Sequence, residues 1–153
     1  MRAKDLMTKK IITAFKEDSI KSVIEKMKNN DIGLVQIVSE NKKIQCVITD
    51  RDIALKLANI SVETSISDIM NCEFVSANPD DDIETIAKMM KEYQLHRILI
   101  LEDNQVVGII SIADLAINKE TNKLINDIVR DISMPNPQKE KPLKYLKVDD
   151  FRL

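Results

Sequence analysis

The chain has 153 residues, a length typical of one compact domain or of two small halves that share a core. Its residues are 44% hydrophobic and 31% charged, and the formal net charge is only -2. This balance excludes the strongly basic surface of a general nucleic-acid-binding protein and gives no reason to expect a membrane partner.

The sequence shows no apolar segment long enough for a signal peptide or a membrane span. The N-terminus reads Met1-Arg2-Ala3-Lys4-Asp5-Leu6, and the apolar runs near residues 97–101 and 106–110 have the length of strands. We therefore expect a soluble, cytoplasmic protein.

The first half of the chain predicts a helix, two strands and a second helix. A stripe of apolar residues at helical spacing is formed by Ile20, Val23, Ile24 and Met27. Two β-rich runs, residues 32–38 and 44–49, follow and are joined by a polar loop. A closing helix is expected over residues 50–59.

The two cysteines lie in this part of the chain. Cys46 is inside an apolar strand-like run, and Cys72 is in a short polar connection. Their spacing lacks the pairing typical of zinc sites or disulfide frameworks, so we predict free thiols, buried or incidental. With one histidine in the chain, a transition-metal site has too few ligands, and no metal is expected.

The second half repeats this order. Its helical stripe is formed by Ile83, Ile86, Ala87 and Met90. Strands are expected over residues 97–101 and 106–111, and a helix over 112–119. A further amphipathic stripe runs from Leu124 to Ile132, and the charged tail over 138–153 is either a disordered end or an arm that docks on a partner.

An internal repeat organises the chain. The segment Asp5-Leu6-Met7 matches Asp68-Ile69-Met70, and Thr49 and Asp52 match Ser111 and Asp114. Residues 1–60 form the first repeat, 61–119 the second, and 120–153 a C-terminal helix and polar tail. Each repeat is too small to cover its own sheet. We therefore predict an α/β fold of the α+β type, with tandem β-α-β-β-α repeats packed with pseudo-twofold symmetry.

Each repeat ends an apolar strand with a hydroxyl residue that is followed three residues later by aspartate. The carboxylates of Asp52 and Asp114 can accept hydrogen bonds from the vicinal hydroxyls of a ribose. Thr49 and Ser111 can bind a neighbouring sugar or phosphate oxygen. The same spacing is also that of a capping box, and the two roles can coexist.

Over residues 3 to 118 the chain resembles the cystathionine β-synthase (CBS) domain family, whose tandem pairs form Bateman modules that sense adenosine-containing ligands. The family pattern is Gly, two apolar residues, Thr or Ser, two variable residues and Asp. The second repeat matches it as GIISIAD, and the first reads CVITDRD, with Cys46 where glycine is usual. The resemblance implies ligand-binding roles for the hydroxyl and acid of each turn.

The stretch that begins with His96 and Arg97 is similar to that of the nucleotide-sensing γ subunit of AMP-activated kinase, where the His-Arg pair faces phosphate. A solvated surface pair is the alternative interpretation. The first repeat has Gly33-Leu34 at this position, and Arg51 offers another cation there. We expect the two sites to differ.

The family holds adenine against the segment near the start of each repeat. These segments are Ile12-Thr13 and Val75-Ser76 in this chain. Ile12 and Val75 have the apolar character of a base-contacting wall, although they are equally ordinary core residues.

The resemblance implies a stand-alone regulatory protein that binds AMP, ADP or ATP, with S-adenosylmethionine or NAD as other candidates, and that changes its contacts with an unknown protein partner. It also implies a homodimer, for which Leu55, Leu57, Leu115 and Ile117 are candidate interface residues. The alternative is a structural dimerisation or interaction module without a small-molecule ligand. Neither hypothesis makes the protein an enzyme, and the sequence lacks a recognisable catalytic constellation.

Overall fold

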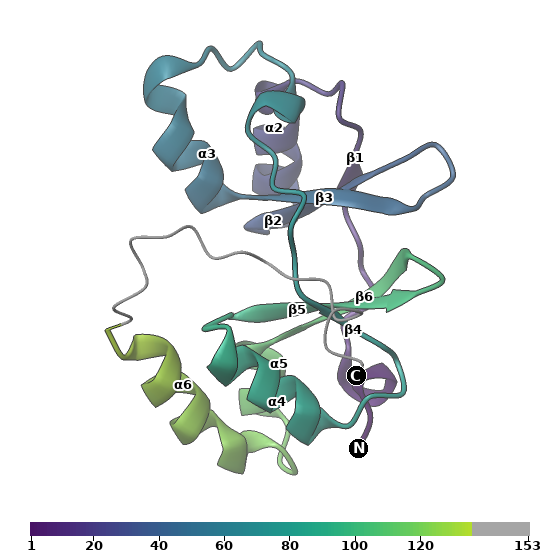
Figure 1. Cartoon of the computed structure of the whole chain (residues 1–153), viewed down its shortest axis with the longest axis vertical. Coiled ribbons are helices and arrows are strands. Elements are labelled where there is room, and N and C mark those ends of the chain that lie inside the picture. Colours follow the sequence, from purple (N-terminus) through teal and green to yellow (C-terminus); the bar gives the residue numbers. More distant parts are fainter. Residues whose placement is uncertain (136–153) are drawn as a thin grey trace. The chain divides into compact units, whose positions relative to one another are not determined.

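The computed structural model describes residues 1–135 of the chain, so the predicted tail over 138–153 lies outside the described residues (Figure 1). The chain forms two compact units. The first unit comprises Ile11–Phe74, and the second combines Met1–Lys10 with the chain from Val75 onward. Both are of the predicted α+β class, each with a three-stranded sheet and helices.

The first unit contains one sheet, two α-helices and two short 3-10 helices. Its elements are β1 (Thr13–Ala14), α2 (Ile20–Asn30), β2 (Leu34–Val38), β3 (Ile44–Thr49), α3 (Asp50–Lys56), η1 (Leu57–Asn59) and η2 (Ile66–Asp68). The strand order is β1-β2-β3, with β1 parallel and β3 antiparallel to β2.

Helix α2 forms where the apolar stripe predicts it. Its N-terminus is capped by Ser19, whose side chain accepts a hydrogen bond from the backbone N–H of Ser22 at 3.1 Å. Ile20, Val23 and Met27 are buried on the face that packs against the sheet. The helices of this unit therefore cover one face of the sheet, as Figure 1 shows for α2 and α3.

The second unit repeats this arrangement and adds helices at both ends of its sequence. Its elements are α1 (Ala3–Leu6), β4 (Ser76–Ala77), α4 (Ile83–Glu92), β5 (Arg97–Glu102), β6 (Gln105–Ser111), α5 (Ile112–Ile117), η3 (Asn122–Leu124) and α6 (Ile125–Ser133). Helix α6 buries Ile128 and Ile132 in the core, as its stripe predicts. Leu115, expected on an exposed interface, is fully buried in this core, so that expectation was wrong.

The segment that opens each sequence repeat pairs with the last strand of the other repeat. Thr8 forms an antiparallel bridge with Ile109 of β6, with hydrogen bonds of 2.9 and 3.0 Å. Asn71 forms the equivalent bridge with Val47 of β3, with hydrogen bonds of 2.7 and 2.8 Å. Each compact unit therefore contains the opening segment of the other sequence repeat. The predicted packing of the two sheets against each other stays a prediction.

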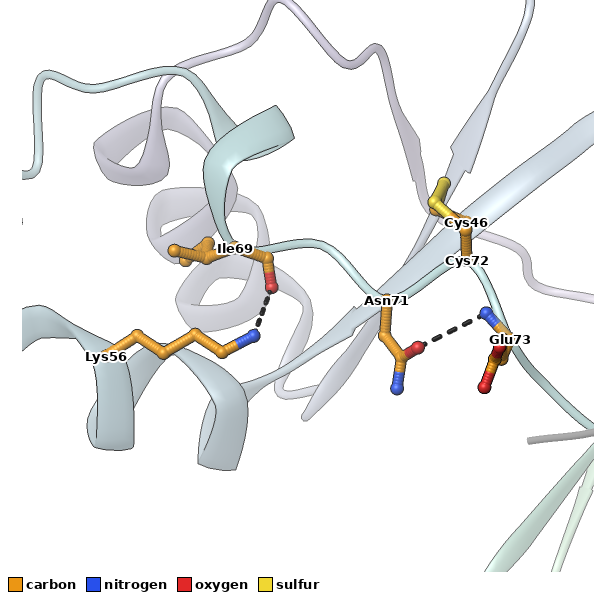
Figure 2. The surroundings of a disulfide bond; sticks show 6 residues. All are labelled: Cys46, Lys56, Ile69, Asn71, Cys72 and Glu73. Atoms are coloured by element: carbon orange, nitrogen blue, oxygen red, sulfur yellow. Dashed lines mark hydrogen bonds between the residues drawn. A yellow bond between two sulfur atoms is a disulfide. The ribbon is translucent and has the colours of Figure 1, made fainter. Parts of the chain in front are cut away.

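The cysteines are joined in a disulfide, so the prediction of free thiols was wrong (Figure 2). Cys46 and Cys72 are 26 residues apart in sequence, with Cα atoms 3.9 Å apart. The bridge between Val47 and Asn71 causes this proximity, because the next pair outward in an antiparallel arrangement is Cys46 and Cys72. Cysteine spacing alone does not reveal a pairing that depends on this long-range bridge.

Candidate functional site

The first predicted turn lies at the junction of β3 and α3. The backbone N–H and the hydroxyl of Thr49 both donate to Oδ2 of Asp52, at 3.0 and 2.8 Å, and the backbone N–H of Asp52 donates to Oγ1 of Thr49 at 3.1 Å. This is a complete capping box. Oδ1 of Asp52 has no hydrogen bond to any of residues 1–135.

The second turn, at the junction of β6 and α5, has the same geometry. The backbone N–H and the hydroxyl of Ser111 donate to Oδ2 of Asp114, at 2.7 and 2.6 Å. Within the described residues, Oδ1 of Asp114 accepts one long hydrogen bond, 3.5 Å, from the hydroxyl of Thr8. The capping interpretation is thus confirmed in both turns, and in each turn one carboxylate oxygen retains most of its capacity to accept.

The structure brings His96 and Arg97 to the second turn. Arg97 is the register partner of Ser111 between β5 and β6, and the backbone N–H of Ile112 donates to the carbonyl of His96 at 3.0 Å. Both side chains are exposed and form no hydrogen bond or ion pair with the described part of the chain. The backbones of His96 and Arg97 thus adjoin the start of α5, and the guanidinium of Arg97 is a candidate phosphate-binding group at this end of the sheet.

The first turn differs from the second turn in its charged residues. Gly33 stands where the second repeat has His96, and Asp50 stands where it has Ile112. A Cβ atom at Gly33 would lie 2.7 Å from Oδ2 of Asp50, so this carboxylate occupies the space beside the glycine. Arg51 is exposed in the first turn of α3. Sequence reasoning missed Asp50, although the motif CVITDRD contains it.

In each predicted adenine-binding segment, one residue faces the hydrophobic core and the next residue does not. Ile12 and Val75 pack into the two hydrophobic cores, which confirms their core role, while their contact with a base stays a prediction. Thr13 is exposed and Ser76 is buried.

Gln36 is a further residue of interest, and sequence reasoning missed it. It is the register partner of Thr13 and alternates with Val35 and Ile37, so it points away from the core side of the sheet. Its side chain is fully buried, and neither amide atom has a hydrogen-bond partner among residues 1–135. The available signal was a polar residue inside the apolar run Leu34–Val38.

The first unit has a cavity of about 500 Å³ that lies away from the predicted site residues. Phe15, Lys16, Val38 and Glu40 are among its lining residues, and none of the predicted site residues is. Because β2 and β3 are antiparallel, the end of β2 that borders this cavity is opposite to the end of the sheet that carries Thr49. The cavity is therefore separate from the first turn.

Residues 1–135 contain no group of three or more His, Cys, Asp or Glu side chains arranged to hold a metal ion. Within the same range, no helix combines the length and the apolar character that crossing a bilayer requires.

Known proteins resemble this chain in sequence and in structure. The model of the CBS domain family matches residues 3–59 and 66–118. The CBS domain-containing protein YhcV of Bacillus subtilis (strain 168) is 32% identical over 135 residues, which cover 87% of this chain and 96% of that protein.

Solved structures give the same result. The CBS domain pair of protein MJ0100, in complex with 5'-methylthioadenosine and S-adenosyl-L-methionine, is 29% identical with a TM-score of 0.69, covering 76% of this chain and 93% of that one. The CBS domain protein PAE2072 from Pyrobaculum aerophilum, complexed with AMP, has a TM-score of 0.74 over 82% of this chain and 98% of that one. Its identity is 18%, so it supports the fold alone.

Proposed function

The chain belongs to the CBS domain family, and from this premise we propose that it is a non-catalytic regulatory protein that binds an adenosine-containing ligand at its two capped turns. The strongest support is the repeated state of Asp52 and Asp114. In each, Oδ2 is fixed by the capping box while Oδ1 keeps most or all of its accepting capacity. A carboxylate held in this way is already oriented for a ligand.

A ribose fits this arrangement because its two neighbouring hydroxyls are donors. Hydrogen bonds to a charged acceptor contribute about 1.5–3 kcal/mol each. The solved domain pair of protein MJ0100 binds two adenosyl compounds, which supports the same ligand class here.

The second turn suits a phosphorylated ligand such as AMP, ADP or ATP. Within residues 1–135 the side chains of His96 and Arg97 form no hydrogen bond or ion pair. Arg97 is the register partner of Ser111, and a guanidinium matches the geometry of a phosphate. NAD also carries phosphate and an adenosine diol.

The first turn suits an adenosyl ligand without phosphate, such as 5'-methylthioadenosine, or a cationic one such as S-adenosylmethionine. Asp50 adds a second carboxylate to the first turn of α3, which also contains Asp52, and Arg51 is the cation between them in the sequence. A phosphate at this end of the sheet would be repelled by both acids.

Regulation requires that the ligand binds one arrangement of the protein better than another. The outcome is a changed contact with a partner protein or with a second copy of the chain. For a homodimer, the exposed side chains of Leu55 and Ile117 are the remaining candidates of the predicted interface, since Leu115 is buried and Leu57 packs on the core.

Calorimetric titrations of the full chain with AMP and with 5'-methylthioadenosine test this function. Asp114→Asn keeps an oxygen for the cap but removes the charge, and we expect it to weaken AMP binding about tenfold or more, equivalent to about 1.4 kcal/mol. Asp52→Asn should weaken 5'-methylthioadenosine binding similarly.

Asp127→Asn, in an exposed acid of α6, is the matched control and should leave both affinities unchanged. If the double variant Asp52→Asn/Asp114→Asn binds both ligands as the unmodified chain does, the ribose role is excluded. If neither ligand stabilises the unmodified chain at millimolar concentration, the structural interaction module is the better description.

A further inference from the structure

Residues 69–73 form a short segment that is bonded both to β3 and to α3, the two elements that meet at the first turn. We refer to this segment as the strap. Asn71 is hydrogen-bonded to Val47 of β3, and Cys72 is bonded to Cys46 of the same strand. The Nζ of Lys56, at the end of α3, donates to the carbonyl of Ile69 at 2.9 Å. Figure 2 shows the disulfide and the Lys56 hydrogen bond together.

The anchors of the strap flank the candidate ligand site. Cys46 precedes Thr49 by three residues on β3, and α3 runs from Asp50 to Lys56. The strap therefore restrains the strand before the turn and the helix after it. A change in the strap changes the restraint on Thr49 and Asp52.

The second unit shows the same backbone pairing without a covalent bond. Thr8 and Ile109 keep both bridging hydrogen bonds, while Lys9 and Gly108 stand at the positions of Cys72 and Cys46. The fold of a unit therefore does not require the disulfide. The cross-link is an addition that is confined to the unit that carries the first turn.

The two cysteines differ in exposure. Cys72 is exposed, whereas Cys46 has 3% of its surface exposed. Cys72 is therefore the more accessible of the two residues to an attacking thiolate. In the cytoplasm, where the sequence predicts this chain to be, disulfides are usually transient or redox-sensing.

We propose that Cys46 and Cys72 form a reversible thiol–disulfide site that controls the affinity of the first turn for its adenosyl ligand; this inference rests on the proposed function. One thiolate of a dithiol reductant attacks the sulfur of Cys72 and displaces the thiolate of Cys46. The second thiol then attacks the resulting mixed disulfide and releases Cys72. The reductant loses two electrons and two protons and leaves as a disulfide, and both cysteines end as thiols.

The oxidised form binds the ligand more tightly. The closed strap holds the end of β3 and the start of α3 in place before the ligand arrives, and such preorganisation lowers the entropic cost of binding. By linkage, the ligand must protect the disulfide from reduction by the same factor by which reduction weakens binding.

The test uses the full chain in two backgrounds. Asp114→Asn isolates the first turn and Asp52→Asn isolates the second. Each is titrated with 5'-methylthioadenosine and with AMP after treatment with oxidised glutathione or with dithiothreitol, and alkylation with mass spectrometry verifies the thiol state. We expect reduction to lower the affinity of the first turn about fivefold or more, and to leave the second turn unchanged.

Cys72→Ser is the matched variant. It should bind as the reduced chain does, with no further response to dithiothreitol. The dithiothreitol concentration that opens the disulfide should also rise in the presence of 5'-methylthioadenosine.

Equal affinities of the oxidised and reduced first turn would overturn this inference, as would failure of the two cysteines to cross-link under oxidised glutathione. Absence of binding at both turns in both redox states would instead overturn the proposed function.

Discussion

Gln36 illustrates how one buried polar residue can lower the stability of a folded protein. Gln36 lies in β2 with its amide buried, and neither the oxygen nor the nitrogen of this amide has a hydrogen-bond partner in the described part of the chain. A buried polar group without a partner costs about 1–3 kcal/mol. Leu99 stands at the equivalent position of the second repeat and is also buried, so leucine is compatible with this place in the fold.

We expect Gln36→Leu to raise the free energy of unfolding of the ligand-free protein by about 1 kcal/mol or more, measured by urea denaturation. The reverse exchange, Leu99→Gln, is the control and should lower it by at least as much. A loss of stability in Gln36→Leu would show that the amide has a partner in solution.

The sequence predicted some features of the site and missed others. The spacing of Thr49 with Asp52, and of Ser111 with Asp114, is a local pattern, so the sequence was sufficient to find both capping boxes. The free state of Oδ1, the proximity of Asp50 to Gly33 and the isolation of Gln36 depend on which strands pair. Local patterns do not contain that information.

Helix α1 and strand β6 meet at a glycine whose missing side chain is essential for their packing. A Cβ atom at Gly108 would lie 2.6 Å from Cγ and 2.8 Å from Cβ of Met7. Because the Met7 Cβ is close to its own backbone, the segment itself would have to move. The glycine of the family pattern has a packing role in the second unit.

Gly108→Ala should therefore lower the free energy of unfolding by about 1–3 kcal/mol, as overpacked cores do, measured by urea denaturation. Gly33→Ala is the matched control. The three atoms nearest to its Cβ would all belong to the exposed, movable carboxylate of Asp50, so a smaller cost is expected. Met7→Ala should offset part of the Gly108→Ala loss in a double-mutant cycle. Additive effects of Met7→Ala and Gly108→Ala would contradict the steric explanation.

Elements with strong periodicity were predicted well, and elements held by distant contacts were not. The stripes of α2, α4 and α6 are properties of the local sequence and place these helices correctly. Helix α1 has four residues, too few for a periodic signal, and its position is set by bridging to β6. Leu115 was misplaced because α5 is buried on the side that carries it.

At the scale of the whole molecule, each compact unit includes a segment that the sequence repeat assigns elsewhere. Residues 1–10 begin the first repeat but belong to the second unit. Ala3 is fully buried there, and the backbone N–H groups of Ala3 and Lys4 donate to the carbonyls of Asp81 and Pro79, both at 2.9 Å. The division at residue 60 describes the sequence repeat, whereas the compact units divide after Lys10 and after Phe74.

The charged contacts of this segment are weaker than its buried ones. Lys4 donates to the carboxylate of Asp80 at 2.6 Å, and this hydrogen bond lowers the pKa of Asp80 and raises that of Lys4. The pair is therefore formed at neutral pH and is lost as the pH falls through the lowered pKa of Asp80. Both side chains are exposed, so solvent screens the interaction and the segment depends mainly on Ala3 and the backbone bridge.

Deletion of residues 1–10 should consequently destabilise the second unit and spare the first. The backbone N–H of Ile109 loses its acceptor, the carbonyl of Thr8, whereas the N–H of Val47 keeps the carbonyl of Asn71. Amide hydrogen exchange should show faster exchange at Ile109 and unchanged protection at Val47. Lys4→Ala in the full chain removes only the ion pair and should leave both amides protected. If the deletion leaves the amide of Ile109 as protected as that of Val47, residues 1–10 are not an integral part of the second unit. Their pairing with β6 would then contribute nothing to its stability.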